Sequence, residues 1–108
     1  MRAKYRCLEQ LLSCYFHPDW LDELRTPRQV IEGYLNEWSA RDFPYLLFEL
    51  SELLVYPEPV VRAEAQAMGC HYYPAGDGLS YRRWFALMSE QIASHINSRS
   101  ARLSTQLP

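Results

Sequence analysis

The side chains that could do chemistry are three cysteines and three histidines, and their spacing argues against a metal or thiol site. A zinc site is typically built from close ligand pairs that a tight turn aims at one point. Only Cys14 with His17, and Cys70 beside His71, come near such a pair. A Cys–His hydrolase needs its nucleophile pointed at its base, which adjacent residues rarely achieve, and no oxyanion loop is recognisable. We therefore expect no metal centre and no catalytic thiol.

The carboxylates and glycines give no catalytic arrangement either. Glu49 and Glu52 fall on the polar face of a predicted amphipathic helix, where we expect solvation rather than the split pKa values of an acid–base pair. The turn at residues 76–78 contains two glycines but lacks the lysine and the flanking pattern of a phosphate-binding loop. We expect a protein that is not an enzyme and that needs no cofactor.

Apolar side chains recur with the period of an α-helix along almost the whole chain. A short extended piece at residues 71–73 is the one exception we expect. The apolar stripes that should face a common core occupy residues 5–16, 30–38, 43–54, 61–68 and 81–96. The fold class that follows is all-α, a compact single-domain bundle of five to six helices.

Capping residues mark several helix ends. Thr26 and Gln29 can form a capping box around a proline at the first helical position. Gly69 stands where a helix C-terminus favours a left-handed residue, and Ser80 can cap the last helix. Beyond that helix the sequence becomes polar and loses its period. We expect a helical domain at residues 1–98 and a polar, frayed C-terminal tail at 99–108.

Length and composition also bear on where the protein acts. A chain of 108 residues with 48% hydrophobic residues suits one domain with its own core. The basic first residues lead into a segment too polar for a secretory signal, and no apolar run approaches the roughly 20 residues that cross a bilayer. An odd number of cysteines fits a reducing compartment. We expect a cytoplasmic protein with no membrane partner.

The predicted folded body is acidic, although the chain carries a formal net charge of only -2. Five of the eleven basic residues lie in the terminal segments. Residues 7–98 hold the other six together with all thirteen acidic residues. Such a surface repels phosphate backbones and attracts basic protein surfaces, so direct nucleic-acid binding is not expected. A merely solvated surface accounts for the same charge.

Two aromatic-rich segments occur where one predicted helix gives way to the next. One is YFHPDW at residues 15–20, and the other is GCHYYPAGDGLSYRRW at residues 69–84. Five of their aromatic side chains are expected to form structural corners that close the core: Tyr15, Phe16, Trp20, Tyr81 and Trp84. Tyr72 and Tyr73 lie on the loop that carries Asp77, where exposed aromatic residues beside an acid would suit a protein interface.

These segments resemble those of the small helical immunity proteins of bacterial contact-dependent growth inhibition systems. The resemblance covers about residues 8–92. It rests on the two aromatic segments, on the helix start at residues 26–27 and on the leucine-rich helix at 43–54. Pro18 stands where the family commonly has glutamine, and the basic ends of the chain lie outside the family pattern.

The resemblance implies a binding protein that neutralises the cognate C-terminal toxin domain of such a system in a one-to-one complex. The toxins are often nucleases; we favour a basic ribonuclease whose active site or substrate groove is occluded. The family motif identifies no contacts, so the contact hypothesis rests on charge and exposure and names Asp19, Asp22, Glu23, Glu32, Glu37, Tyr72, Tyr73 and Asp77. Two other classes stay open, namely a helical adaptor that docks a basic protein and a small metal-dependent or thiol enzyme.

Overall fold

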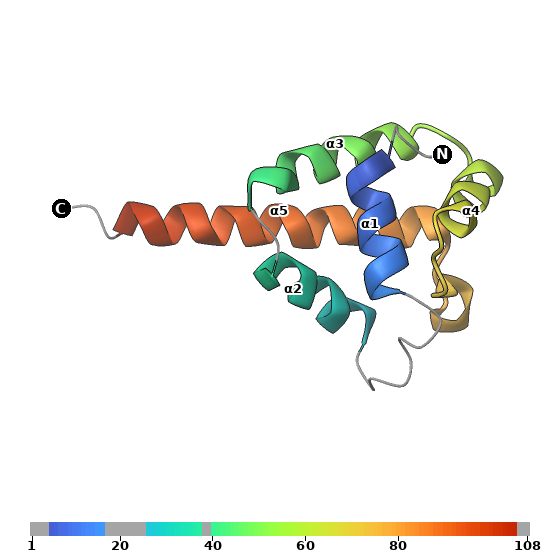
Figure 1. The fold of residues 1–108 in the computed structure, drawn as a ribbon, viewed down its shortest axis with the longest axis horizontal. Coiled ribbons are helices and arrows are strands. Elements are labelled where there is room, and N and C mark those ends of the chain that lie inside the picture. Colours follow the sequence, from blue (N-terminus) through green and yellow to red (C-terminus); the bar gives the residue numbers. More distant parts are fainter. Residues whose placement is uncertain (1–4, 17–25, 38–39, 106–108) are drawn as a thin grey trace.

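The computed structural model describes residues 5–16, 26–37 and 40–105, and within them the chain is helical and contains no strand. This confirms the predicted all-α class, while the extended piece expected at residues 71–73 does not pair into a sheet. Figure 1 shows the α-helices, which are α1 (Arg6–Tyr15), α2 (Pro27–Glu37), α3 (Phe43–Leu53), α4 (Glu58–Ala67) and α5 (Tyr81–Thr105). Two 3₁₀ helices accompany them, η3 (Ala40–Asp42) and η4 (Pro74–Asp77).

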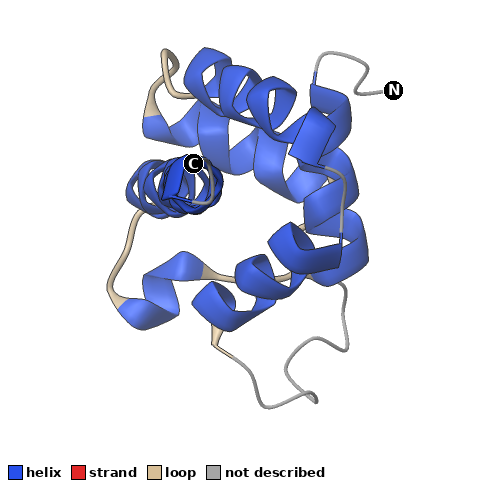
Figure 2. Cartoon of the chain, turned by 90° about the vertical axis from the view of Figure 1, so that its left-hand side faces the viewer, coloured by secondary structure: helices blue, strands red, loops and turns tan. Residues whose placement is uncertain are grey.

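The long helix α5 is the axis on which the bundle is built. It packs against α2, α3 and α4, while α1 packs against α2 and α3. Figure 2 looks along α5 and shows the other helices gathered around one side of it. The C-terminal end of α5 projects beyond them (Figure 1) and continues to Thr105, through most of the segment predicted as a tail. That this segment frays stays a prediction.

Each predicted apolar stripe supplies side chains to one buried core. The leucines of α3 that face inward, Leu46, Leu50 and Leu53, have no exposed surface. Burial of an aliphatic or aromatic side chain stabilises the fold by about 1.5–3 kcal/mol, so these contacts are the main source of stability. The largest fully buried side chains are Tyr34, Phe16, Phe43, Phe85, Leu8, Leu11, Leu12, Ile31, Leu35, Leu46, Leu50 and Leu53.

Local capping residues set the ends of the helices as predicted. The backbone N–H of Thr26 donates to Gln29 Oε1 (2.9 Å), and the N–H of Gln29 donates to Thr26 Oγ1 (3.1 Å), which is the reciprocal capping box at the start of α2. Ser80 Oγ accepts from the N–H of Arg83 (3.0 Å) in the first turn of α5. Gly69 follows α4 with a φ of 87°, in the left-handed region.

Two carboxylates on other helices complete the capping, and here one prediction is wrong. Glu49 of α3, expected in solvent, is 8% exposed and accepts from the backbone N–H groups of Cys7 (3.1 Å) and Leu8 (2.9 Å). The first N–H groups of a helix lack partners within it, and α1 begins against α3, so the carboxylate of Glu49 satisfies them. Glu58 does the same for α5, accepting from Tyr81 (2.9 Å) and Arg82 (3.0 Å).

Candidate partner-binding surface

The two aromatic segments meet in one buried cluster. The ring of Phe16 lies 5.1 Å from that of Trp84 and 5.9 Å from that of Tyr72, and the Tyr72 and Trp84 rings are 4.7 Å apart. The backbone N–H of His71 donates to the carbonyl of Phe16 (2.9 Å), which ties the second segment to the end of α1. Tyr81 is also buried. Trp20 lies outside the described residues.

The loop residues expected at an interface divide into buried and exposed members. Tyr72 is only 5% exposed, so its predicted exposure is wrong; its ring packs against those of Phe16 and Trp84. Its hydroxyl donates to Asp77 Oδ2 (2.6 Å), and burial together with this carboxylate raises the pKa of Tyr72. Tyr73 and Asp77 are exposed. The loop therefore presents a carboxylate that a buried tyrosine holds in place.

The two predicted acids of α2 are exposed and face different neighbours. Glu32 Oε2 accepts from Gln91 Nε2 (2.9 Å), and its Oε1 lies 3.5 Å from Nδ1 of His95 on α5. Glu37 accepts from the hydroxyl of Tyr15 on α1 (2.5 Å). Glu32 thus lies on the side of α2 toward α5, whereas Glu37 lies toward α1. The remaining predicted contacts, Asp19, Asp22 and Glu23, lie outside the described residues.

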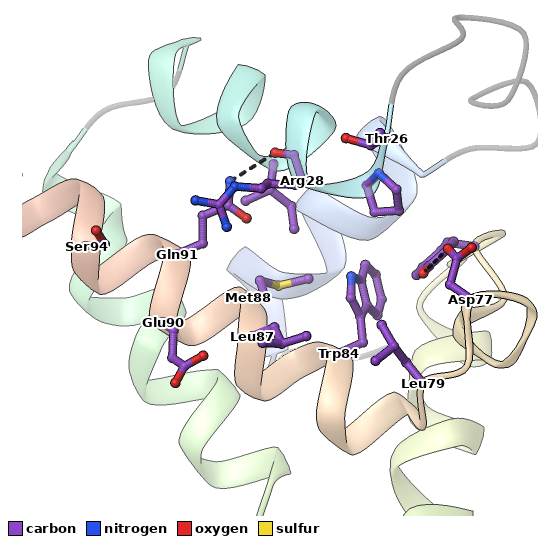
Figure 3. A pocket seen from close by; sticks show the side chains of 13 residues that line it. Thr26, Arg28, Asp77, Leu79, Trp84, Leu87, Met88, Glu90, Gln91 and Ser94 are labelled. Carbon is purple, nitrogen blue, oxygen red and sulfur yellow. Dashed lines mark hydrogen bonds between the residues drawn. The ribbon is translucent and has the colours of Figure 1, made fainter.

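A groove of about 470 Å³ runs between the start of α2, the first half of α5 and the η4 loop (Figure 3). Apolar side chains make up most of its lining: Pro27, Ile31, Tyr72, Leu79, Trp84, Leu87 and Met88. Arg28, Asp77 and Glu90 provide the charged lining residues. Size and lining resemble those of ligand pockets, which are mostly apolar with a few polar groups.

A smaller polar depression of about 290 Å³ continues the groove along the same two helices. It shares Arg28, Gln91 and Ser94 with the groove and adds Glu32 and His95 to the lining. The side-chain amide of Gln91 on α5 donates hydrogen bonds to two acceptors on α2, the carbonyl of Arg28 (2.9 Å) and the carboxylate of Glu32. We call the groove and this depression together the α2–α5 face. Two predicted contacts with exposed carboxylates lie on this face: Asp77 lines the groove and Glu32 lines the depression.

A second surface was missed by sequence reasoning. Tyr45 and Phe48 on the outer side of α3 are 62% and 63% exposed. Tyr45 borders a cleft of about 680 Å³ between α1 and α3, to which Glu9 and Asp42 also contribute. The signal was present, because α3 (FPYLLFELSEL) is apolar on nearly every side and one helix cannot bury its whole circumference in a small bundle.

Two of the three cysteines, Cys7 and Cys70, do not have the environment of catalytic thiols. Burial raises the pKa of Cys70 to about 11, and its Sγ donates to the carbonyl of Tyr72 (3.6 Å). Burial, reinforced by Glu49, raises the pKa of Cys7 to about 11 as well. A nucleophilic thiol needs a lowered pKa, so neither residue is prepared for attack. Within the described residues, no three His, Cys, Asp or Glu side chains are grouped so as to hold a metal ion.

No helix in the described part of the chain is both long enough and apolar enough to cross a membrane. In comparison with known proteins, the family model described as CdiI immunity protein matches residues 4–92, which include the two aromatic segments and nearly all of the groove lining. No curated protein and no solved structure matches the chain significantly.

Proposed function

The chain belongs to the CdiI immunity protein family, and from this premise we propose that it binds and neutralises the cognate C-terminal toxin domain of a contact-dependent growth inhibition system. In the proposal the toxin is a basic nuclease, with a ribonuclease favoured. The two proteins form a one-to-one complex in the cytoplasm. The active site or substrate groove of the toxin is occluded, and the immunity protein acts by binding alone.

The observation that supports this proposal best is the α2–α5 face, which joins a concave apolar surface to exposed carboxylates. An interface of standard size takes about 800 Å² from each partner, roughly an eighth of the 6768 Å² that this protein exposes. Interfaces of this kind combine an apolar centre with a polar rim. The α2–α5 face has both features, so we place the toxin there.

The carboxylates explain how such a protein could act on a nuclease. A nuclease groove carries cationic side chains that receive the phosphates of the substrate. The carboxylates of Glu32, Asp77 and Glu90 can form ion pairs with those cationic side chains in place of the substrate phosphates. Complementary charge also speeds the encounter of the two proteins. The other predicted contacts stay part of the proposal as further toxin contacts: Asp19, Asp22, Glu23, Glu37, Tyr72 and Tyr73.

A titration of toxin activity tests the proposal. The purified toxin domain is assayed on RNA and on DNA while this protein is added in steps from zero to several equivalents. We expect RNA cleavage to fall linearly and to stop at one equivalent. Cleavage that persists in excess folded protein would contradict the immunity function. If the toxin cleaves only DNA and one equivalent of this protein stops that cleavage, the immunity function stands and the ribonuclease assignment is refuted.

A further inference from the structure

The floor of the α2–α5 groove is apolar and almost fully buried. Ile31, Trp84 and Met88 are 1–3% exposed and belong to the core, so the groove is a shaped extension of it. Leu79 and Leu87 are half-buried along its sides. Water in such a groove has few polar partners, and its displacement by an apolar group is favourable. A methionine in the floor can adapt to the shape of an incoming side chain.

The rim of the groove is acidic. Figure 3 shows Asp77 at the η4 end and Glu90 on α5, with Trp84 and Leu87 between them. The bond from the Tyr72 hydroxyl holds the Asp77 carboxylate at this end of the groove while the residue stays exposed. Among the described residues that line the groove and its polar continuation, Asp77, Glu90 and Glu32 outnumber the one arginine, Arg28. A cationic partner segment is therefore attracted and an acidic one repelled.

From the floor and the rim together, we propose that the α2–α5 groove takes an apolar side chain of the toxin that is flanked by arginine or lysine. The apolar side chain contacts the surface formed by Trp84, Leu87 and Met88. The flanking cations pair with Asp77 and Glu90. The identity of the partner as the toxin rests on the proposed function, whereas the chemistry of the segment rests on the groove itself.

A matched pair of variants tests the location of this contact. Leu87→Arg places a cation beside the groove, where it would oppose both the apolar and the basic parts of the segment. Phe48→Arg makes the same kind of change at an exposed apolar residue of α3 that does not line the groove. By calorimetry with the toxin domain, we expect Leu87→Arg to weaken binding at least tenfold and Phe48→Arg to bind as the unchanged protein does.

Further variants keep the test decisive if Leu87→Arg unfolds. Ser94→Arg alters an exposed polar residue of the same groove, so the fold should tolerate it, and it should weaken binding in the same direction. The charge requirement is tested by Glu90→Arg, whose loss of affinity should be restored by changing one arginine or lysine of the toxin to glutamate. If no such substitution at any arginine or lysine of the toxin restores the affinity of Glu90→Arg, the proposal that the bound segment is cationic is overturned.

The outcomes separate this inference from the proposed function. If the unchanged protein binds the toxin and only Phe48→Arg weakens the complex, the contact lies on α3 and the groove inference is overturned while immunity stands. If a folded, unchanged protein does not bind the toxin at all, the proposed function itself fails. Unchanged affinity of folded Leu87→Arg and Ser94→Arg for the toxin would also overturn the inference.

Discussion

At the scale of single residues, Glu49 joins two helices through one carboxylate. It is nearly buried and accepts two backbone N–H groups at the start of α1. Hydrogen bonds to a charged group contribute about 1.5–3 kcal/mol. We expect Glu49→Ala to lower the free energy of unfolding by about 2–3 kcal/mol, because both N–H groups lose their partner. Urea denaturation followed by circular dichroism measures the change.

Glu52 gives the matched control for this prediction. It lies on the same helix and is half-buried, and Glu52→Ala removes a carboxylate of the same kind without uncapping α1. Its effect should stay within about 0.5 kcal/mol, the usual range for surface substitutions. Equal effects of the two substitutions would mean that the cap contributes nothing beyond the removal of a negative charge.

Cys14 should react much faster than the other two cysteines. Cys14 is exposed, whereas burial holds the pKa of Cys70 and of Cys7 at about 11. At pH 8 only about one thiol in a thousand is then the reactive thiolate at the two raised sites. With iodoacetamide and peptide mass spectrometry, we expect Cys14 to be labelled first. Labelling of Cys70 should rise about tenfold per pH unit up to its pKa. If Cys70 is labelled as fast as Cys14 at pH 8, the Cys70 thiol is not buried and its pKa is not raised.

At the scale of elements, Gly69 ends α4 in a way that only glycine accommodates well. The N–H of Cys70 donates to the carbonyl of Ala65 (3.2 Å) and the N–H of Gly69 to that of Gln66 (3.1 Å), the two bonds of a Schellman motif. An added Cβ would also lie 3.4 Å from the Cβ of Ser13 on α1. We expect Gly69→Ala to destabilise the protein by about 1–2 kcal/mol, the cost of the left-handed conformation.

Gly76→Ala is the corresponding control in the same loop region. Apart from Gly76 itself and its two chain neighbours, no heavy atom lies within 4 Å of the position of an added Cβ, and its φ is not in the left-handed region. The substitution should leave stability unchanged or raise it slightly, because alanine restricts the unfolded chain. Thermal melts of both variants test this difference. Equal melting temperatures would refute the claim that the end of α4 needs a glycine at position 69.

The elements also show which parts of the fold could be predicted. The capping box of Thr26 and Gln29 and the glycine after α4 depend on residues a few positions apart, so the sequence pattern identifies them. Glu49 bonds to a residue 41 positions away in the chain, and its role depends on where α1 meets α3. Periodicity assigned Glu49 to a polar face. It could not show that this face of α3 meets the start of α1.

At the scale of the whole molecule, the candidate site was predicted in part. The charge of the body and the aromatic segments pointed to Glu32 and Asp77, which the fold places on one face. The same reasoning predicted that the side chain of Tyr72 is exposed, although its ring packs in the buried cluster with Phe16 and Trp84. The groove itself could not be predicted, because its shape arises from the packing of α2, α5 and the η4 loop.

The acidic face predicts a salt-dependent association. Glu32→Lys combined with Glu90→Lys should slow association with the toxin about tenfold or more at low salt and flatten its dependence on ionic strength. Glu9→Lys combined with Glu52→Lys changes the net charge equally but away from the α2–α5 face, so it should slow association much less. Stopped-flow measurements from 50 to 500 mM salt compare the two. Equal slowing by both pairs would assign the effect to net charge alone.

We propose above all that this protein protects a cell from its cognate toxin by binding it. The most direct measurement is to produce the toxin domain in cells with and without this chain, to count survivors and to purify any complex. We expect toxin-producing cells to survive only when this chain is also made, and we expect a stable one-to-one complex to be recovered from them. Cell death in the presence of abundant folded protein, with no complex recovered, would contradict it.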